Sequence, residues 1–458
     1  MNPPPSPGIA RRQFLRRAGC GVALFNILPG VRVGGADGLP VGEKLNLAGV
    51  GIGSRGGAVI DEAASLGHNI VALCDVDENY AGKQFEKYPK ARRFTDYRVM
   101  LDRMGPGVDG VVIGTPDHTH AVIAMEAMRR GRHVYCEKPL AHSVGEVHRL
   151  MATAQEHKVV TQLGNQGNSS NSIRRVCEWI WAGAIGKVHT VHAGCDAFPQ
   201  VYCQIPNLPK LQERPPVPAG LDYELWVGPA QFRPYSPLWV HWNWRGWLPF
   251  GGGAVGDWIC HVVDPAFWAL DLGAPSSIRA EAVDYDLATQ GLTYPPGTRI
   301  TYEFPAKADR GPVQLVWHDG RTRIPRPPGL AADHPVPGTG AILHGDQGMI
   351  VHGSHGGGNA VLLPEDLMEQ YSGSRAPAER VPRVRGHVWD WAEAIRTGRP
   401  AGSRFAYGGP LTDLGLLGLI ALRFPGEKLL WDGDALQFKN HAAATTLVNP
   451  PYRAGWTL

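Results

Sequence analysis

The chain has 458 residues, and 45 Lys and Arg against 42 Asp and Glu give a formal net charge of +3. This near-balance, without a long basic run, gives no reason to expect nucleic acid or an anionic membrane as a partner. A hydrophobic fraction of 43% suits a globular protein of two or three domains and excludes wholesale disorder. No apolar stretch reaches the roughly 18 residues of a membrane span, so we expect no stable membrane insertion.

The N-terminus has the layout of an export signal. Arg11 and Arg12 form an arginine pair, and an uncharged, mostly apolar run follows over 18–30. This pattern is typical of a twin-arginine signal, and a small residue such as Ala36 offers a cleavage site. We therefore predict a signal peptide over 1–36 and a periplasmic or extracellular location. The alternative interpretation is an N-terminus that is merely basic.

The cysteines and histidines do not have the spacing of a metal site. Six cysteines lie beyond the predicted signal, with no C-x-x-C pair among them, and no H-E-x-x-H pattern occurs. The sequence predicts no metal and no disulfide framework.

A glycine-rich turn follows the first apolar run of the body of the chain. The run 45–50 leads into Gly51, Gly53 and Gly56, which fit G-x-G-x-x-G, and a helix is expected over 58–66. Glycine allows the tight turn, the close approach of the backbone to a pyrophosphate, and the aiming of helix amides at negative charge. The segment predicts a dinucleotide site.

An aspartate lies where such a site needs a carboxylate. The second apolar run, 70–74, ends at Asp75, 19 residues after Gly56. A carboxylate there can accept hydrogen bonds from both ribose hydroxyls, and with Asp77 nearby it would repel a 2′-phosphate. We therefore expect NAD, with NADP less favoured.

Strand-like and helix-like stretches then alternate up to residue 163, which predicts a parallel, doubly wound sheet. The strand-like runs are 108–113, 133–136 and 159–163, and the helix-like stretches are 118–130 and 143–157. Ligands bind at the carboxyl ends of such strands, so the loops 115–120, 137–139 and 164–167 should line the site. We assign residues 37–165 to this NAD-binding domain.

Several of these loops resemble the Gfo/Idh/MocA oxidoreductases, named for glucose-fructose oxidoreductase and inositol dehydrogenase. The resemblance rests on the glycine motif, on Thr115-Pro116 with His120, and on Glu137-Lys138-Pro139, and it extends from about Lys44 to at least Asp264. It implies a Rossmann domain, a lysine, Lys138, that reaches the reacting hydroxyl, and a homodimer or homotetramer. The expected cofactor-binding residues are Gly51, Ile52, Gly53, Arg55, Gly56, Asp75, Thr115, Pro116, His120, Glu137, Lys138 and Gln166.

The regular alternation stops after Gly164. Strand-like runs follow at 188–192, 299–304 and 313–317, between proline-rich loops. We predict a second domain over 166–458 with a mixed, largely antiparallel sheet and helices on one face, for substrate binding and oligomerisation.

The most informative segment of this second domain is 251–261. If it enters a helix, Asp257 and His261 fall at i and i+4 on one face. By resemblance, His261 would move the proton of the substrate hydroxyl, while Asp257 would hold the sugar or orient the imidazole. The predicted catalytic residues are thus Lys138, Asp257 and His261.

Five tryptophans lie close together in this region, at positions 239, 242, 244, 247 and 258. Indole faces stack on the C–H faces of sugars, but such residues also fill cores or subunit interfaces. Trp244 and Arg245 are the candidates for substrate contact beside the three catalytic residues. Tyr202 and His192 are weaker candidates.

The preferred hypothesis is an exported, NAD-dependent sugar or cyclitol oxidoreductase with a tightly bound cofactor. Tight binding is expected because no pool of free NAD exists outside the cytoplasm. One alternative is an NAD-dependent glycosidase that oxidises C3 of a glycoside transiently and eliminates the glycosidic group. Another is a non-catalytic carbohydrate-binding protein on the same fold.

Overall fold

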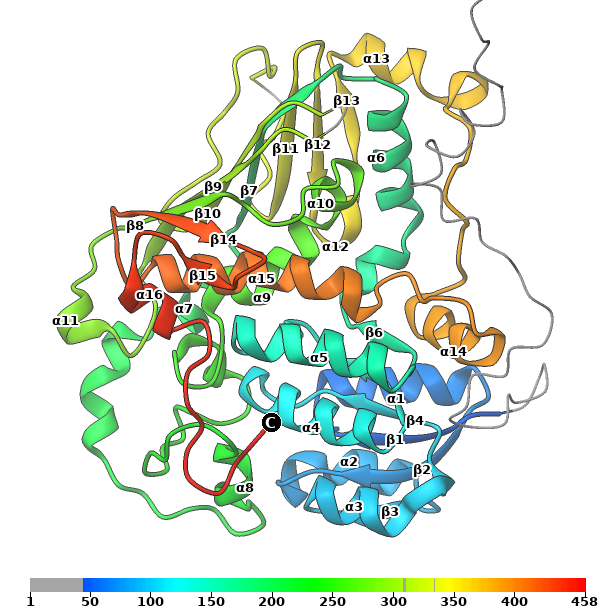
Figure 1. The fold of residues 1–458 in the computed structure, drawn as a ribbon, viewed down its shortest axis with the longest axis vertical. Coiled ribbons are helices and arrows are strands. Elements are labelled where there is room, and N and C mark those ends of the chain that lie inside the picture. Colours follow the sequence, from blue (N-terminus) through cyan, green and yellow to red (C-terminus); the bar gives the residue numbers. More distant parts are fainter. Residues whose placement is uncertain (1–43, 308–309, 333) are drawn as a thin grey trace, which may run out of the picture.

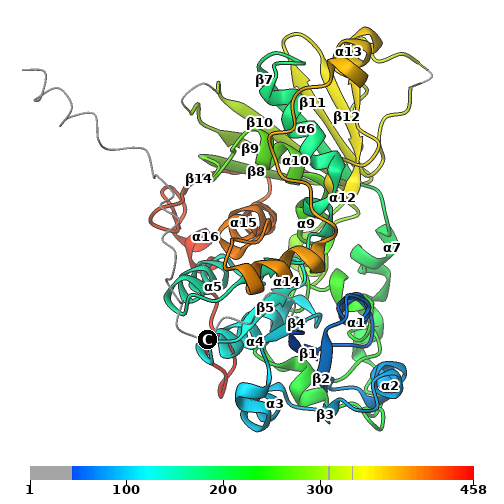
Figure 2. The same ribbon diagram turned by 90° about the vertical axis from the view of Figure 1, so that its right-hand side faces the viewer.

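The computed structural model describes residues 44–307, 310–332 and 334–458 (Figure 1). The predicted export signal, residues 1–36, lies outside the described residues. The described chain forms two sheets with helices around and between them (Figures 1 and 2).

The first sheet is parallel and has the strand order β3-β2-β1-β4-β5-β6. Its central strands are short apolar runs that are buried on both faces, as parallel sheets require. The expected doubly wound sheet is confirmed. The strands are β1 (Asn46–Val50), β2 (Asn69–Cys74), β3 (Arg92–Phe94), β4 (Gly110–Ile113), β5 (His133–Cys136) and β6 (Thr161–Leu163).

The connecting helices begin at polar caps. Asp77 accepts hydrogen bonds from the amides of Asn79 and Tyr80, and Ser143 forms a capping box with Glu146. The helices are α1 (Arg55–Ser65), α2 (Glu78–Lys87), α3 (Tyr97–Met104), α4 (Asp117–Arg129) and α5 (Val144–Glu156). Sequence reasoning did not identify β3, α2 and α3. Strand β3 has no apolar pattern to reveal it, because it has only three residues and two of them are exposed arginines.

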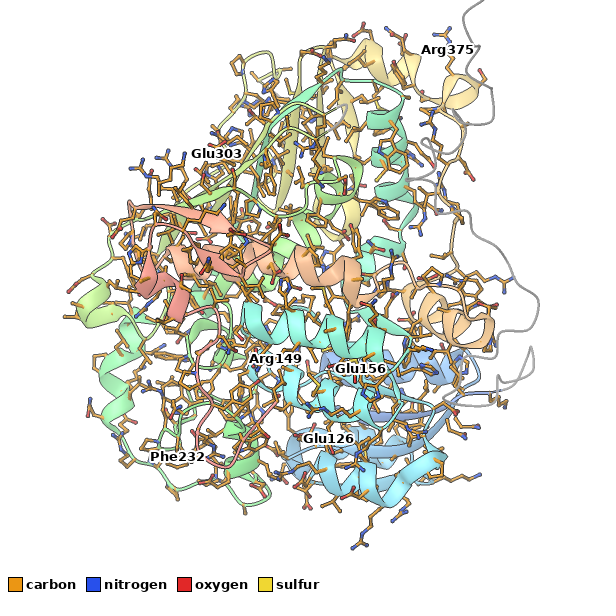
Figure 3. All side chains as sticks on the ribbon, in the orientation of Figure 1. Glu126, Arg149, Glu156, Phe232, Glu303 and Arg375 are labelled. Atoms are coloured by element: carbon orange, nitrogen blue, oxygen red, sulfur yellow. The ribbon has the colours of Figure 1, made fainter. Side chains whose placement is uncertain are left out.

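Helix α5 shows how the distribution of apolar residues directs a helix against its neighbours. Val147 and Leu150 are fully buried, whereas Arg149 and Glu156 project from the outer face of the helix (Figure 3). This amphipathic pattern directs one face of the helix inward, where it packs against α4 and α15 (Phe405–Ala421).

The second sheet has nine strands in the order β13-β12-β11-β7-β10-β9-β8-β14-β15. Strands β7 and β10 are parallel and the other neighbouring pairs are antiparallel, so the predicted mixed, largely antiparallel sheet is confirmed. The strands are β7 (Val188–Cys195), β8 (Ser277–Ala282), β9 (Gly297–Phe304), β10 (Val313–Gly320), β11 (Gly340–Gly345), β12 (Met349–Gly353), β13 (Val361–Leu363), β14 (Lys428–Asp432) and β15 (Gln437–Phe438).

Helices pack on the face of this sheet that points toward the first domain (Figure 2). The apolar helix α15 lies between the second sheet and α5, and the hydroxyl of Tyr302 in β9 donates to the carbonyl of Leu414 in α15 at 2.8 Å. The remaining helices are α6 (Asn171–Trp181), α7 (Pro199–Tyr202), α8 (Tyr223–Val227), α9 (Gly253–Val262), α10 (Asp264–Ala269), α11 (Leu287–Gln290), α12 (Ser354–Gly357), α13 (Glu365–Gln370), α14 (His387–Thr397) and α16 (Ala442–Thr446).

The chain returns to the first domain after the second sheet. Trp391 of α14 is fully buried and packs with Leu47 and Ile60 of the first domain. Near the C-terminus, the amide of Gly145 donates to the carbonyl of Val448 at 2.8 Å. Residues late in the sequence therefore complete the core of the first domain.

Residues 199–250, here called the covering segment, cross from the second domain to the end of β2. The amide of Asp222 donates to the carbonyl of Val76 at 2.8 Å, and the amide of Glu78 donates to the carbonyl of Gly220 at 3.0 Å. The segment has an aromatic core of its own that includes Trp247 and Phe250. It closes one side of the space above the first sheet.

None of the helices in the part of the chain that the structure describes is both long and apolar enough to cross a membrane.

Candidate functional site

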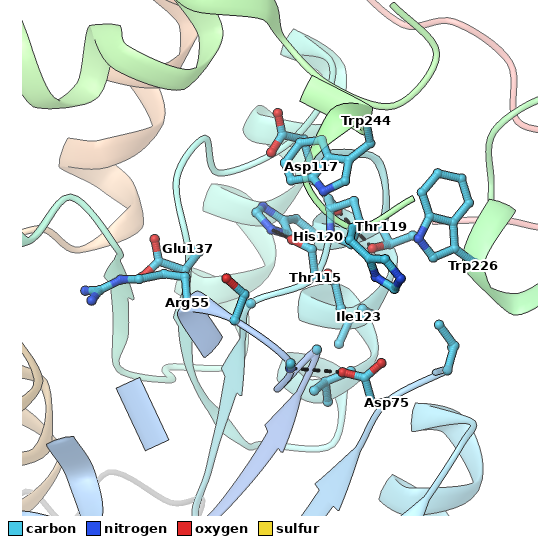
Figure 4. A pocket seen from close by; sticks show the side chains of 18 of the residues that line it. Arg55, Asp75, Thr115, Asp117, Thr119, His120, Ile123, Glu137, Trp226 and Trp244 are labelled. Carbon is cyan, nitrogen blue, oxygen red and sulfur yellow. Dashed lines mark hydrogen bonds and ion pairs between the residues drawn. The ribbon is translucent and has the colours of Figure 1, made fainter. Parts of the chain in front are cut away.

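A cavity of about 590 Å³ lies at the carboxyl ends of the first sheet (Figure 4). Loops after β1, β2, β4 and β5 form one wall, and the covering segment, α9 and α12 form the other. Ligands of parallel, doubly wound sheets bind at this edge, so this cavity is the candidate site.

The glycine loop has the geometry of a nucleotide cradle. Gly51 adopts a φ of +74°, and a Cβ there would lie 2.5 Å from the side chain of Thr115. A Cβ on Gly56 would lie 2.1 Å from the carbonyl oxygen of Gly51. The loop leads directly into α1, whose first amides have no partner within the helix and carry partial positive charge. The residues therefore fit a bound pyrophosphate.

Asp75 has a structural role that sequence reasoning missed. Its carboxylate accepts hydrogen bonds from the amides of Ile52 at 2.8 Å and Gly53 at 3.2 Å, and from the amide of Asp77 at 3.1 Å. Burial raises the pKa of Asp75 to about 6, although these amides oppose the rise. The side chain thus ties the end of β2 to the glycine loop while it lines the cavity.

Two of the expected cofactor-binding residues form an ion pair. Arg55 Nε donates to Glu137 Oε1 at 3.0 Å, which joins the start of α1 to the loop after β5 (Figure 4). Burial raises the pKa of Glu137, and the neighbouring Arg55 opposes the rise.

His120 braces two loops of the same wall. Its ring nitrogens lie 2.8 Å from the carbonyl oxygens of Pro139 and Thr115. Burial lowers the pKa of His120 to about 4. Because both nitrogens already face protein atoms, His120 shapes the cavity rather than presenting a free group to a ligand. Pro116 lies between the braced Thr115 and the start of α4, and the Lys138–Pro139 peptide is cis.

Lys138 and Asp257 come from different domains and form a buried ion pair. Lys138 Nζ donates to the carboxylate of Asp257 and, at 3.0 Å, to its carbonyl oxygen. Burial by itself would raise the pKa of Asp257, but Lys138 and Arg245 hold this pKa well below its usual range. The carboxylate is therefore charged across the physiological range.

Tyr202 and Arg245 complete the surroundings of Asp257. The hydroxyl of Tyr202 donates to Asp257 Oδ2 at 2.6 Å and accepts from Trp258 Nε1 at 2.7 Å. Arg245 Nε lies 3.3 Å from the same carboxylate oxygen. The sequence made Tyr202 only a weak candidate, and the structure places it in a four-residue helix, 55 positions away from Asp257.

His261 lies beside this ion pair without joining it. It is buried, and within the described ranges its Nδ1 has no hydrogen-bond partner. Burial, then the charge of Lys138, lowers the pKa of His261 well below its usual value, so the imidazole is neutral at pH 7. Of the two roles expected for Asp257, a hydrogen bond that orients His261 does not occur among the described residues.

Four buried polar atoms in the cavity wall have no hydrogen-bond partner in the part of the chain that the structure covers. They are Thr115 Oγ1, Gln166 Oε1, Arg245 Nε and His261 Nδ1, and all four residues line the cavity. Buried polar atoms are nearly always hydrogen-bonded, so this cluster indicates that a polar ligand completes the site.

The five tryptophans divide between core and cavity. Trp239 and Trp247 are buried in the core of the covering segment, Trp242 and Trp258 line the cavity, and the buried Trp244 belongs to both. The Arg245 guanidinium lies over the rings of Trp242 and Trp244, at 4.0 and 4.2 Å from their centroids. Trp226, which sequence reasoning did not single out, also lines the cavity (Figure 4).

Sequence reasoning also missed the role of another carboxyl group in the cavity wall, that of Asp117. Asp117 is buried at the start of α4 and accepts a hydrogen bond from the amide of Gly252 at 3.2 Å. Burial, then the charge of Asp257, raises the pKa of Asp117 to about 8. The sequence showed only an aspartate before two histidines, which is an ordinary start for a helix.

Asp264 braces the second domain outside the cavity. It accepts hydrogen bonds from Asn165 at 2.9 Å, from Asn168 and from Tyr407. Across the described residues, no group of three or more His, Cys, Asp or Glu side chains could hold a metal ion.

Comparison with known proteins identifies relatives of both domains. A family model described as oxidoreductase family, NAD-binding Rossmann fold, of the Gfo/Idh/MocA group matches residues 45–165. The corresponding C-terminal alpha/beta domain matches residues 199–304. Both matches lie on the domains that carry the two walls of the cavity.

Two kinds of curated relative align with part of the chain. Inositol 2-dehydrogenase from Salmonella typhimurium is 28% identical over 158 residues, which is 33% of this chain and 46% of the relative. Glycosyl hydrolase family 109 protein 1 from Shewanella sp. strain ANA-3 is 29% identical over 205 residues, which is 39% of this chain and 44% of the relative. The chain therefore spans less than half the length of these curated relatives.

Solved structures share the fold over most of the chain. The aldose-aldose oxidoreductase from Caulobacter crescentus has a TM-score of 0.56 at 16% identity and covers 85% of this chain and 100% of its own. The WlbA dehydrogenase from Bordetella pertussis, in complex with NADH and UDP-GlcNAcA, has a TM-score of 0.57 at 16% identity and covers 85% and 99%. Residues 45–165 and 199–304 thus match the two domain models of the Gfo/Idh/MocA oxidoreductases, and the solved structures share the fold.

Proposed function

We propose that the protein is a nicotinamide-dependent oxidoreductase that transfers a hydride at a secondary hydroxyl of a sugar or cyclitol. The observation that carries this proposal is the meeting of Lys138, Asp257 and His261 in the cavity onto which the glycine loop opens. The inositol dehydrogenase relative and the sugar-related structural neighbours support the substrate class.

The expected cofactor is NAD, held by the glycine loop and the loops after β2, β4, β5 and β6. When bound, the nicotinamide ring accepts the hydride from the carbon that carries the hydroxyl. Asp75, Asp77 and Asp96 line the end of the cavity near β2, where their charges would repel the 2′-phosphate of NADP. The basic side chains of the lining, Arg55, Lys138 and Arg245, pair instead with Glu137 and Asp257.

Side chains in the cavity can bind the substrate hydroxyl and accept the proton that leaves it. The Lys138 ammonium donates a hydrogen bond to the substrate oxygen, and its ion pair with Asp257 orients this lysine. His261 is neutral and has an unpartnered Nδ1, so it can accept the hydroxyl proton as the hydride leaves. Trp242, Trp244 and Trp258 offer apolar faces for the sugar ring.

Tight retention of the cofactor is part of the proposal. The covering segment is hydrogen-bonded to the end of β2, and the ring of Tyr80 in α2 stacks on His241 of this segment at 4.0 Å. Release of a bound dinucleotide would require these contacts to separate. A cofactor that is retained must be regenerated within each catalytic cycle, for example by oxidising one sugar and reducing another.

The first experiment is analysis of the nucleotide that purified, folded protein releases on denaturation. Mass and absorbance should identify NAD(H) in an amount equal to the protein, and sugar pairs should then turn over without added cofactor. Protein that is empty and binds NAD only weakly would contradict tight retention and favour an ordinary dehydrogenase.

Export by the twin-arginine route is proposed from residues outside the described part of the chain. Replacing Arg11-Arg12 with Lys-Lys should leave the folded protein in the cytoplasm, as fractionation would detect. Normal export of this variant would contradict the signal.

A second candidate function is glycoside cleavage through transient oxidation, favoured by the alignment with the glycosyl hydrolase family 109 protein. Oxidation at C3 would acidify the C2 proton, and the glycosidic group would leave by elimination. A glycoside cleaved without added cofactor in D₂O should gain deuterium at C2 of the released sugar. Sugar binding without any turnover would instead support a non-catalytic carbohydrate-binding protein.

We also propose a homodimer or homotetramer. The face of the second sheet that carries Arg279, Arg299 and Glu303 is open in the described chain. Light scattering of the purified protein would test this assembly, and a monomer at micromolar concentration would contradict it.

A further inference from the structure

His355 occupies a left-handed backbone conformation that is uncommon for residues other than glycine. Its φ and ψ are 56° and 55°, and it lies in the turn of α12, between β12 and β13. The two residues that follow, Gly356 and Gly357, also have positive φ. Such backbone strain persists where the surrounding structure holds a side chain in place, and it is frequent at active sites.

The segment that follows β6 holds this turn in place. A Cβ on Gly167, which follows β6, would lie 2.1 Å from the carbonyl carbon of His355. Ser170 Oγ donates to the carbonyl oxygen of Gly356 at 3.2 Å. The position of His355 is therefore fixed by contacts with the segment that directly follows the first sheet.

The imidazole of His355 lies directly against His261. The two rings stack with centroids 4.3 Å apart and planes 25° from parallel, and the ring of Trp258 packs edge-on against His355 with centroids 5.7 Å apart. Ser354 Oγ lies 2.8 Å from His355 Nδ1. The half-buried ring lines the cavity together with His261.

His261 depends on this stacking because hydrogen bonds do not orient it. Its Nδ1 is unpartnered within the described residues, and Asp257 is engaged by Lys138, Tyr202 and Arg245. We propose that His355 is a positioning residue for His261, which fixes the plane of the imidazole and disfavours a second positive charge beside Lys138. The catalytic consequence rests on the proposed function, whereas the coupling of the two rings does not.

The charged groups around the pair set the expected pH behaviour. Lys138, His355 and Arg55 lower the pKa of His261 beyond the effect of burial, and Asp257 opposes them. For His355 itself, burial lowers the pKa first, followed by Lys138 and Arg55. Removing the imidazole at position 355 should therefore raise the pKa of His261.

A titration of His261 tests this coupling without any need for enzymatic activity. Protein labelled with ¹⁵N-histidine would be titrated by NMR as wild type and as His355→Asn, with the His261 signal assigned from His261→Gln. Asparagine tolerates the left-handed backbone, so the variant should fold. We expect His261 to titrate at a higher pH in His355→Asn, and an unchanged titration would overturn the inference.

Two further variants separate stacking from charge. His355→Phe retains an aromatic ring against His261 but cannot become protonated, so it should keep the orientation of the His261 ring and still raise the pKa of His261. His189→Asn is the control, because His189 is exposed on β7 and does not line the cavity. A control that shifted His261 as strongly as His355→Asn would overturn a specific role for His355.

Kinetics then distinguish failure of this inference from failure of the proposed function. His355→Asn should lower kcat by about tenfold, leave nucleotide retention unchanged, and move the acidic limb of the pH profile to higher pH. An active wild type with neither change in the variant would overturn the positioning role. A wild type that oxidises no sugar, but whose His261 still responds to His355→Asn, would support the coupling and contradict the proposed function.

Discussion

The two walls of the cavity are built in different ways. In the first domain, Asp75, Thr115 and Glu137 each follow the end of a parallel strand, so the sheet itself brings them together. In the second domain, Tyr202, Arg245, Asp257 and His355 come from four separate segments and meet only because the chain folds back on itself. The first wall is a general dinucleotide surface, whereas the second can vary segment by segment and is suited to substrate selection.

This comparison predicts that substitutions in the first wall change nucleotide retention, whereas substitutions in the second change substrate binding. Lys138 joins the two walls at the proposed catalytic residues, because it follows β5 and pairs with Asp257 in α9.

Loss of Lys138 should therefore have the largest effect. In Lys138→Ala we expect hydride transfer to fall by about 10³-fold, because the substrate oxygen loses its charged donor. Nucleotide content should stay near that of the wild type. Stopped-flow absorbance at 340 nm and denaturing release of nucleotide would measure the two quantities. Exposed Lys187→Ala is the control, and intact turnover in Lys138→Ala would remove this lysine from the mechanism.

The tryptophans offer a comparison within the second wall. Trp247 is 0% exposed, so Trp247→Ala should lower the free energy of unfolding by about 3–5 kcal/mol in urea denaturation. Trp242 is 41% exposed at the cavity, so Trp242→Ala should leave stability nearly unchanged and raise the substrate KM about three- to tenfold. Phe232→Ala, 53% exposed and away from the cavity, is the matched control. Equal stability losses at 242 and 247 would contradict the division into core and cavity.

Substitutions of Asp75 test whether the first wall binds the nucleotide. Its carboxylate holds the amides of Ile52 and Gly53 and is expected to accept the ribose hydroxyls. Asp75→Ala should weaken NAD retention by about 10- to 100-fold, measured by equilibrium dialysis, and reduce the preference for NAD over NADP. Asp75→Asn, which keeps one acceptor oxygen, should lose less. Unchanged retention in Asp75→Ala would mean that the ribose is held elsewhere.

Asp117 should make stability depend on pH. Its folded-state pKa of about 8 lies above the unfolded value, so its contribution to stability is present at low pH and is lost as pH rises toward 8. The free energy of unfolding should therefore fall by up to about 1.4 kcal/mol for each pH unit in this range. Asp117→Asn should be more stable than wild type at pH 8 relative to pH 5, in urea unfolding at equal nucleotide content. A pH-independent difference between the two proteins would show that Asp117 ionises normally.

Local patterns made much of the first wall predictable. Runs of buried apolar residues, the capped helices and the glycine spacing are properties of short segments, and the parallel topology then places their ends at one edge. The i and i+4 spacing of Asp257 and His261 within α9 is local in the same sense. Local spacing could not predict that Asp257 pairs with Lys138, because the two residues are 119 positions apart in the sequence.

The sequence by itself determined the alternation of strands and helices, the glycine loop and the residues at the ends of the strands, because backbone geometry and burial act there over a few residues. Only the tertiary structure decided that Tyr202 and Arg245 surround Asp257, that His355 stacks on His261, and which tryptophans enter the core. Contacts between distant segments depend on how the covering segment and the second sheet fold back over the first domain. A side chain's burial and charge partners are therefore set by the assembled fold and not by its neighbours in the sequence.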